Sequence, residues 1–281
     1  MNEVVTSTGW QAQLDLEYGW RGGRTRLIHK QQHGPLTLQR SFYPEGDTCH
    51  NYILHPPGGV VAGDTLRINV KANSRAHCLL TTPGATKFYR SGSQLPGSQY
   101  QRLTVADGAR LEWLPQPSIF FPGARVELKT DIEIAEGGKF VGWEMLCFGR
   151  PANKEPFDHG AIRSQTRLSL AGDLRLVEQF HTSADDMLLS ATGMRGTAMQ
   201  GCFIAAPCQE PHRKALEQIL QSKTGDVYPH PVGVTLVDEV LIVRALGEQS
   251  EPMLELFTRL WSELRQQWLK KSPCLPRIWA T

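Results

Sequence analysis

The sequence predicts a mainly β protein with two helices in its C-terminal part. Turn residues recur between short apolar segments, at Asn73-Ser74, Asp107-Gly108, Gly137-Gly138 and Gly172-Asp173. The flanking residues alternate between apolar and polar, as in Leu103 and Val105 before the second turn and Leu111 and Trp113 after it. We therefore expect stacked antiparallel hairpins or a coiled, two-layer, β-helix-like sheet, and either arrangement fits better than a parallel α/β fold.

Helical periodicity is clear only late in the chain. After Pro252, which suits a first helical turn, one face carries Met253, Phe257, Leu260, Trp261, Leu264 and Trp268. Lys270 and Lys271 suit the end of this helix. A shorter helix is expected at 211–222, with its inward face made of Ala215, Leu216, Ile219 and Leu220. We expect both helices to cover sheet edges or faces rather than to bind a cofactor.

Composition limits the classes of function. The chain has 281 residues, of which 40% are hydrophobic, enough to build one large core. Thirty Lys and Arg residues against 28 Asp and Glu residues leave a net charge of +2, without a basic block typical of nucleic-acid binding. No apolar run approaches the ~18 residues of a membrane helix. We predict a single domain over residues 1–281, with neither nucleic acid nor a membrane as a partner.

The first residues are polar and lack the pattern of a secretory signal, which predicts a cytoplasmic location. We expect residues 1–8 to be disordered. The cysteines form no C-x-x-C pair, so neither a zinc ribbon nor a redox motif is indicated, and most are expected to be reduced core thiols.

Two carboxylates fall on apolar faces of predicted strands. One face of the segment 174–181 reads Leu174, Leu176, Glu178 and Phe180, and one face of 139–148 reads Phe140, Gly142, Glu144, Leu146 and Phe148. A buried carboxylate is costly unless it is paired, hydrogen-bonded or hydrated. Two interpretations stay open: an ion pair with an arginine such as Arg150 or Arg175, or a water-filled passage that Asp64 and Thr86 also line.

The sequence contains no catalytic motif that would indicate an enzyme. Glu144 and Glu178 could serve as the general acid and base of a glycan hydrolase, but nothing fixes their separation and the few aromatic residues form no sugar platform. The segment Pro83 to Lys87 lacks the first glycine of a phosphate-binding loop, and no G-x-S-x-G elbow is present. We assign no catalytic residue.

Six segments together resemble one known family. They are Phe42-Tyr43-Pro44-Glu45, His55-Pro56-Pro57-Gly58-Gly59-Val60-Val61-Ala62-Gly63-Asp64, the run from Thr81 to Ser91, Glu112-Trp113-Leu114-Pro115-Gln116, Cys147-Phe148-Gly149-Arg150-Pro151 and Leu275-Pro276-Arg277-Ile278-Trp279. Each is weak alone, but the ordered set is similar to the UreD (also called UreH) family of urease accessory proteins. Ala62 departs from a glycine that is frequent in the family, which is tolerated if its φ is negative.

This resemblance implies a urease maturation chaperone that is not an enzyme. It implies docking to the urease apoprotein and to a UreF-type accessory protein, through which a UreG-type GTPase joins the complex. It also implies that nickel, as a transient ion and not a tightly bound cofactor, passes through an internal tunnel. Carried onto this sequence, the tunnel residues are Asp64, Thr86, Glu144 and Glu178. A purely structural adaptor without a nickel path stays open as the alternative.

Two further groups of residues are candidate contacts. Cys49, His50 and His55 lie close together in the sequence and could touch nickel transiently, although a structural role for each is the preferred interpretation because their spacing fits no standard ligand pair. The candidate partner-binding residues are Trp261, Trp268, Arg277 and Trp279. Core packing would explain the tryptophans equally well.

Overall fold

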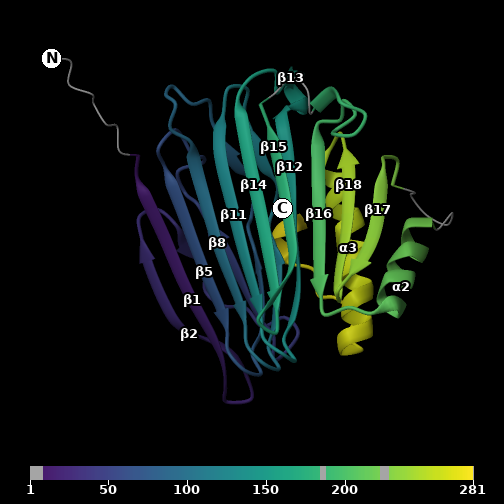
Figure 1. Cartoon of the computed structure of the whole chain (residues 1–281). Coiled ribbons are helices and arrows are strands. Elements are labelled where there is room, and N and C mark those ends of the chain that lie inside the picture. Colours follow the sequence, from purple (N-terminus) through teal and green to yellow (C-terminus); the bar gives the residue numbers. More distant parts are fainter. Residues whose placement is uncertain (1–8, 184–187, 222–227, 281) are drawn as a thin grey trace.

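The structure, a computed structural model, describes residues 9–183, 188–221 and 228–280. The expected disorder of residues 1–8 lies outside these ranges. Within them the chain forms two β-sheets and a helical layer (Figure 1). Across the same ranges, none of the helices is both long enough and apolar enough to cross a membrane.

Sheet 1 has the strand order β15-β14-β11-β8-β5-β1-β2. Its strands are β1 (Gln11–Arg21), β2 (Arg24–His33), β5 (Thr65–Ala72), β8 (Gly97–Val105), β11 (Arg125–Ile134), β14 (Ala161–Leu170) and β15 (Asp173–Thr182). The central strands, β1, β5, β8, β11 and β14, run parallel to one another. β2 and β15 pair antiparallel at the two edges.

Sheet 2 has the order β17-β18-β16-β12-β9-β6-β4-β3, with β7, β10 and β13 attached beside this path. Its strands are β3 (Thr37–Leu38), β4 (Cys49–Leu54), β6 (His77–Thr81), β7 (Thr86–Phe88), β9 (Arg110–Leu114), β10 (Ser118–Phe120), β12 (Lys139–Arg150), β13 (Glu155–Pro156), β16 (Met199–Ala206), β17 (Val232–Val237) and β18 (Val240–Gly247). β4, β6, β9 and β12 are parallel, whereas β16, β18 and β17 continue the sheet antiparallel.

The chain coils back and forth between the two sheets, which confirms the coiled two-layer alternative. The turns at Asn73-Ser74, Asp107-Gly108 and Gly137-Gly138 each join a strand of sheet 1 to a strand of sheet 2, so the hairpins expected there do not form. The turn at Gly172-Asp173 does close a hairpin, between β14 and β15. Alternation identifies a strand and its buried face, but it does not reveal whether the next strand pairs beside it or crosses to the facing layer.

Two apolar cores hold the layers together, and β12 contributes to both. Phe140 and Phe148 point into the core between the sheets, which we call the inter-sheet core. Trp143 and Met145, on the other face of β12, point into the core between sheet 2 and the helices, which we call the helical core. The face predicted for Glu144, between Phe140 and Phe148, is therefore the one that faces sheet 1.

The two predicted helices are present as α2 (Glu210–Gln221) and α3 (Ser250–Leu269), with short 3-10 helices η1 (Pro151–Asn153) and η2 (Arg277–Ala280). The buried face of α3 contains every predicted residue except Trp268, which is half-buried, and adds Leu256 and Arg265. α3 covers the outer face of sheet 2, as expected for a helix that shields a sheet face. It ends at Leu269 and is capped by Lys270, whose φ of 55° is left-handed and whose N–H donates to Gln266 O.

Candidate functional site

A cavity of about 220 Å³ lies between the two sheets. This volume holds several water molecules, since each needs roughly 10–15 Å³. Many of the side chains that line it are polar. This is unusual, because the other inward positions of the two sheets form an apolar core. The polar side chains that line it are His55, Thr82, Thr86, Lys87, Gln99, Gln101, Gln116, Ser118, Thr130, Glu144, Ser164, Thr166, Glu178 and Gln200.

One polar wall is a row across sheet 1. Gln101 of β8, Thr130 of β11, Thr166 of β14 and Glu178 of β15 are register partners on four neighbouring strands. Register partners on adjacent strands point to the same face, so these side chains stand side by side. The row ends at Glu178 because β15 is the edge strand of sheet 1.

The opposite polar wall lies at an interruption of sheet 2. The chain leaves β6 at Thr81 and re-enters the sheet as β7, and it likewise leaves β9 at Leu114 and re-enters as β10. Proline residues occupy both interruptions, and proline has no N–H to donate to a strand ladder. The Gln116 N–H donates instead to Thr82 Oγ1 at 2.9 Å, and the Thr86 N–H donates to Pro117 O at 2.9 Å.

Glu144 is the carboxylate held deepest in this cavity. Ser164 Oγ, from sheet 1, donates a hydrogen bond to Glu144 Oε2 at 2.9 Å. Burial raises the pKa of Glu144 to about 7; the Ser164 hydrogen bond opposes this rise and the nearby Glu178 carboxylate adds to it. Within the described residues no lysine, arginine or histidine forms an ion pair with Glu144. A buried carboxylate with one neutral donor is a favourable place for a passing cation.

Glu178 also lines the cavity, but it has a charged partner. Arg244 Nε donates to Glu178 Oε1 at 2.8 Å, and a second guanidinium nitrogen donates to Oε2 at 2.5 Å. The arginines expected for this role were wrong, because Arg150 pairs with Glu155 and Arg175 with Asp173. Ion pairing and a cavity location, which the sequence left as alternatives, therefore occur together at Glu178.

Asp64 lies outside the cavity wall and stabilises a loop. Its carboxylate accepts the N–H of Trp10 at 3.1 Å and of Val61 at 2.9 Å, so both oxygens are occupied by backbone donors. Gly63 beside it has a φ of 83°, a left-handed conformation that glycine adopts freely. Thr86, Glu144 and Glu178 thus share one cavity, whereas Asp64 supports the loop beside it.

The three candidate metal contacts are not brought together. Cys49 Sγ donates to Asn51 Oδ1 at 3.4 Å, and His50 Nε2 lies 2.6 Å from Glu45 Oε1. His55 lines the cavity, packs against Trp10 and has no hydrogen-bond partner at Nε2. In the described part of the chain, no group of three or more His, Cys, Asp or Glu side chains is arranged to hold a metal ion.

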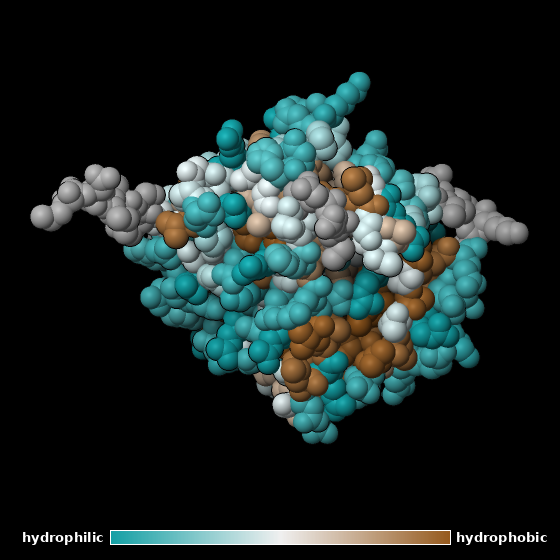
Figure 2. All heavy atoms as spheres, turned by 45° about the horizontal axis from the view of Figure 1, so that its top comes forward, coloured by the Kyte–Doolittle hydropathy of each residue, from teal (hydrophilic) through white to brown (hydrophobic). Residues whose placement is uncertain are grey.

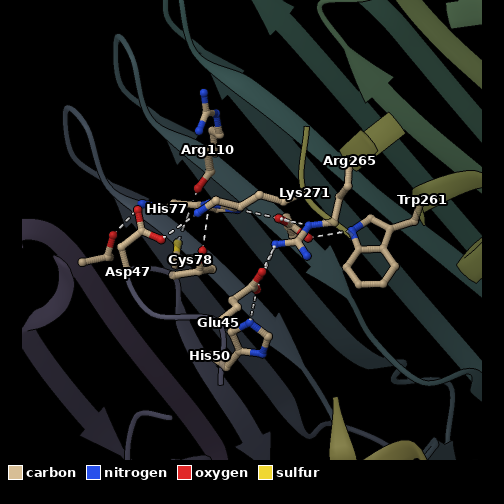
Figure 3. Close-up of polar contacts among 12 residues, drawn as sticks. Glu45, Asp47, His50, His77, Cys78, Arg110, Trp261, Arg265 and Lys271 are labelled. Atoms are coloured by element: carbon tan, nitrogen blue, oxygen red, sulfur yellow. Dashed lines mark hydrogen bonds and ion pairs between the residues drawn. The ribbon is translucent and has the colours of Figure 1, made fainter. Parts of the chain in front are cut away.

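A second set of buried charges, which we call the Glu112 network, ties α3 to sheet 2. Figure 3 labels its members Glu45, His77, Trp261 and Arg265. Glu112 of β9 accepts hydrogen bonds from the Trp261 indole at 2.6 Å and from Arg265 Nε at 3.1 Å, and His77 Nε2 lies 2.5 Å from its Oε1. Arg265 also binds both oxygens of Glu45, at 2.8 and 2.9 Å. Every oxygen of Glu112 is therefore used by the fold.

The candidate partner-binding residues divide by burial. Trp261 is fully buried in the helical core, so its assignment to a partner surface was wrong: its ring packs under α3 and its indole serves Glu112. Trp268 and Trp279 are half-buried, and the Trp279 indole donates to Thr81 Oγ1 at 2.9 Å. Arg277 is exposed.

Hydrophobic surface is found elsewhere. Figure 2 shows hydrophobic side chains gathered in one area at the lower right of that view. The exposed large hydrophobic residues of the described chain include Leu174, Val177 and Val237. Leu174 was expected to face inward with Glu178, but the register of β14 and β15 shifts between Leu168 and Ser169, and this irregularity puts Leu174 out of phase.

Sequence reasoning missed Arg244, Ser164, Glu112 and Arg265. For Arg265 a signal existed: it follows Trp261 by four residues and so falls on the apolar face of α3. The other partners come from strands far apart in the sequence, and periodicity along one strand does not identify them.

Comparisons with known proteins agree on one family. The model of the family described as UreD urease accessory protein matches residues 11–280. The urease accessory protein UreD of Aliivibrio fischeri (strain MJ11) is 45% identical over 287 residues, which cover 99% of this chain and 98% of the relative. Proteins of the same name from Escherichia coli and Vibrio parahaemolyticus are each 44% identical, over 277 and 281 residues, and cover 98% of this chain and 99% and 98% of their own.

Proposed function

Because the chain belongs to the UreD family of urease accessory proteins, we propose that it delivers nickel to urease through the cavity between its two sheets. As a member of this family it is an accessory protein of urease maturation and not an enzyme. The proposal extends to its setting: a cytoplasmic complex with the urease apoprotein, a UreF-type accessory protein and, through it, a UreG-type GTPase.

The observation that carries the nickel path is the environment of Glu144. Its carboxylate lies in a polar cavity, has one hydroxyl donor and has no cationic partner in the described chain. A divalent ion that keeps most of its water shell needs such a surface: oxygen atoms to hydrogen-bond its waters, and a carboxylate to offset its charge. One free carboxylate binds weakly, and weak binding lets the ion leave toward its destination.

The other candidate residues have different roles in this proposal. Thr86 lies at the interruption of sheet 2, where few hydrogen bonds join neighbouring strands. In this proposal it marks one end of the path. Glu178, at the edge strand of sheet 1, marks the other end. His55 offers an unpartnered ring nitrogen in the cavity wall, whereas Cys49 and His50 are engaged in bonds to the fold. Asp64 acts indirectly, by holding the loop that includes Gly58 of the cavity wall.

A plug in the cavity tests the proposal. Thr86→Trp fills the wall at the sheet 2 interruption, and Thr235→Trp, at an exposed position of β17, is the matched control. Both variants are co-expressed with urease and the other accessory proteins, and complexes are isolated before activation is measured. We expect Thr86→Trp to assemble normally yet to lower urease activity and nickel content, with the control unaffected. Normal activation by an assembled Thr86→Trp variant would instead indicate a structural adaptor, with nickel travelling outside this chain.

A further inference from the structure

At the β15 end of the cavity, one ion pair joins the two sheets. Sheet 1 stops at β15, whereas sheet 2 continues beyond it through β16, β18 and β17, and Figure 1 shows these strands extending past β15. The gap between the edge of one sheet and the face of the other is bridged by the bidentate pair of Arg244 and Glu178.

The strand register places this pair in line with Glu144. Glu144 of β12 is the partner of Cys202 on β16, and Cys202 is the partner of Arg244 on β18. Their side chains therefore share the face of sheet 2 that looks toward sheet 1. On the facing sheet, Thr166 is the partner of Glu178. The two rows meet where Arg244 reaches across to Glu178.

The pair also lies at the boundary between the cavity and solvent. The Arg244 side chain is 45% exposed and the Glu178 side chain 21% exposed, while Glu178 lines the cavity. A cation that enters or leaves by this end must pass a guanidinium that repels it and that already occupies both oxygens of the last carboxylate. Glu144, farther inside, has no such cationic partner among the described residues.

We propose that Arg244 is the gate of the passage: it positions Glu178, closes the β15 end and keeps free divalent cations from entering while urease is not docked. This inference rests on the proposed nickel path. Arg244 acts through Glu178 and is a positioning residue. The gate requires arginine in particular, because its planar guanidinium contacts both carboxylate oxygens. Lysine carries the same charge but cannot bind both oxygens in this way.

The test compares Ni²⁺ binding by three forms of the full-length chain in its co-purified accessory complex, in the absence of urease. Equilibrium dialysis with Ni²⁺ alone should show weak binding by the wild type and about tenfold tighter binding by Arg244→Gln, since removal of one positive charge beside a carboxylate is worth about one order of magnitude in cation affinity. Arg244→Lys should lie between them. Adding Glu178→Gln to Arg244→Gln should remove the gain. Unchanged binding in Arg244→Gln would overturn the gate.

Failure of the gate and failure of the nickel path are distinguishable. The same preparations are assayed for urease activation together with Glu144→Gln, which leaves the Arg244 pair intact. If Arg244→Gln binds Ni²⁺ like the wild type while Glu144→Gln lowers activation, the gate is wrong and the path stands. If neither variant changes activation, the path itself is wrong. A thermal midpoint measured on each variant separates both outcomes from misfolding, and the exposed Arg244 pair is expected to leave the midpoint within a few degrees.

Discussion

Two buried glutamates, Glu112 and Glu144, show how the same residue serves two purposes in one molecule. Burial alone would raise the pKa of Glu112, but the hydrogen bond and charge of His77, the charge of Arg265 and the Trp261 indole together lower it to about 2. Glu144 also lies inside the protein, where it faces the cavity, yet among the described residues the Ser164 hydroxyl is its one hydrogen-bond donor, and its pKa rises to about 7. Glu112 is almost completely excluded from solvent, Glu144 faces the cavity, and the hydrogen-bond donors around the two carboxylates differ.

In the proposed function, this difference separates a structural carboxylate, Glu112, from one that a passing ion can use, Glu144. The fold supplies the positive charge and the donors that Glu112 needs, so both of its carboxylate oxygens already have partners within the protein. The fold does not supply a cation for Glu144, so the ionised carboxylate destabilises the folded protein above neutral pH. A mobile cation or water in the cavity would reduce this cost.

The largest expected effect is at Arg265. Replacing it by leucine leaves Glu112 and Glu45 buried without their shared cation, and breaking a buried pair in this way costs about 3–5 kcal/mol. Urea denaturation at pH 7 measures the loss. The control is Lys271→Leu, which breaks an exposed pair with Asp47 and should cost no more than about 1 kcal/mol. Equal stability of the two variants would show that the Glu112 network does not hold α3.

Glu112→Gln tests the lowered pKa. A carboxyl group with a folded pKa below its unfolded value stabilises the protein above the unfolded pKa, and this stabilisation is lost as the pH falls toward the folded pKa. With a pKa near 2 against a usual 4.5, the wild type should exceed the variant by roughly 3 kcal/mol at pH 7. The difference should narrow as the pH falls below 4.5. A constant gap between pH 7 and pH 3 contradicts the assigned ionisation.

Glu144→Gln should show the opposite sign. A folded pKa raised to about 7 means that the wild type loses stability as the pH rises from 4.5 through 7. The variant should therefore match the wild type at pH 4.5 and be more stable at pH 8, by up to roughly 3 kcal/mol. Denaturation curves between these pH values measure the gain. A variant less stable than the wild type at pH 8 would mean that Glu144 has an unseen charged partner.

Much of the cavity could be predicted from the sequence, but its partners could not. Alternation placed Glu144 and Glu178 on inward faces because period-2 patterns report the face of a strand. Arg244 lies 66 residues from Glu178, and Arg265 lies 153 residues from Glu112. Such pairs depend on how the sheets and helices stack, which local periodicity does not encode. The same limit explains the hairpins wrongly expected at three of the turns.

The smallest expected effect is at Ser164, the residue that donates a hydrogen bond to Glu144. Ser164→Ala removes the hydrogen bond that opposes the rise in the pKa of Glu144, so this pKa should rise further. Stability at pH 8 should fall by about 1.5–3 kcal/mol, as expected for a hydrogen bond to a charged group. The readout is an upward shift in the pH at which the decline in stability levels off, because the decline starts near the unfolded pKa and ends above the folded pKa. If that pH stays fixed, Ser164 does not interact with the ionised carboxylate.

The most direct test of the nickel path is the nickel content of urease matured with Glu144→Gln. Urease is activated at pH 7.5, above the pKa of about 7 of the wild-type Glu144 carboxyl, and its nickel is counted per active site by elemental analysis after the accessory complex has been shown to assemble. The proposed passage predicts that Glu144→Gln, though folded and assembled, lowers the initial rate of nickel incorporation about tenfold or more, because a unit charge at close range is worth several kcal/mol to a divalent ion. An unchanged rate with full nickel content would contradict it.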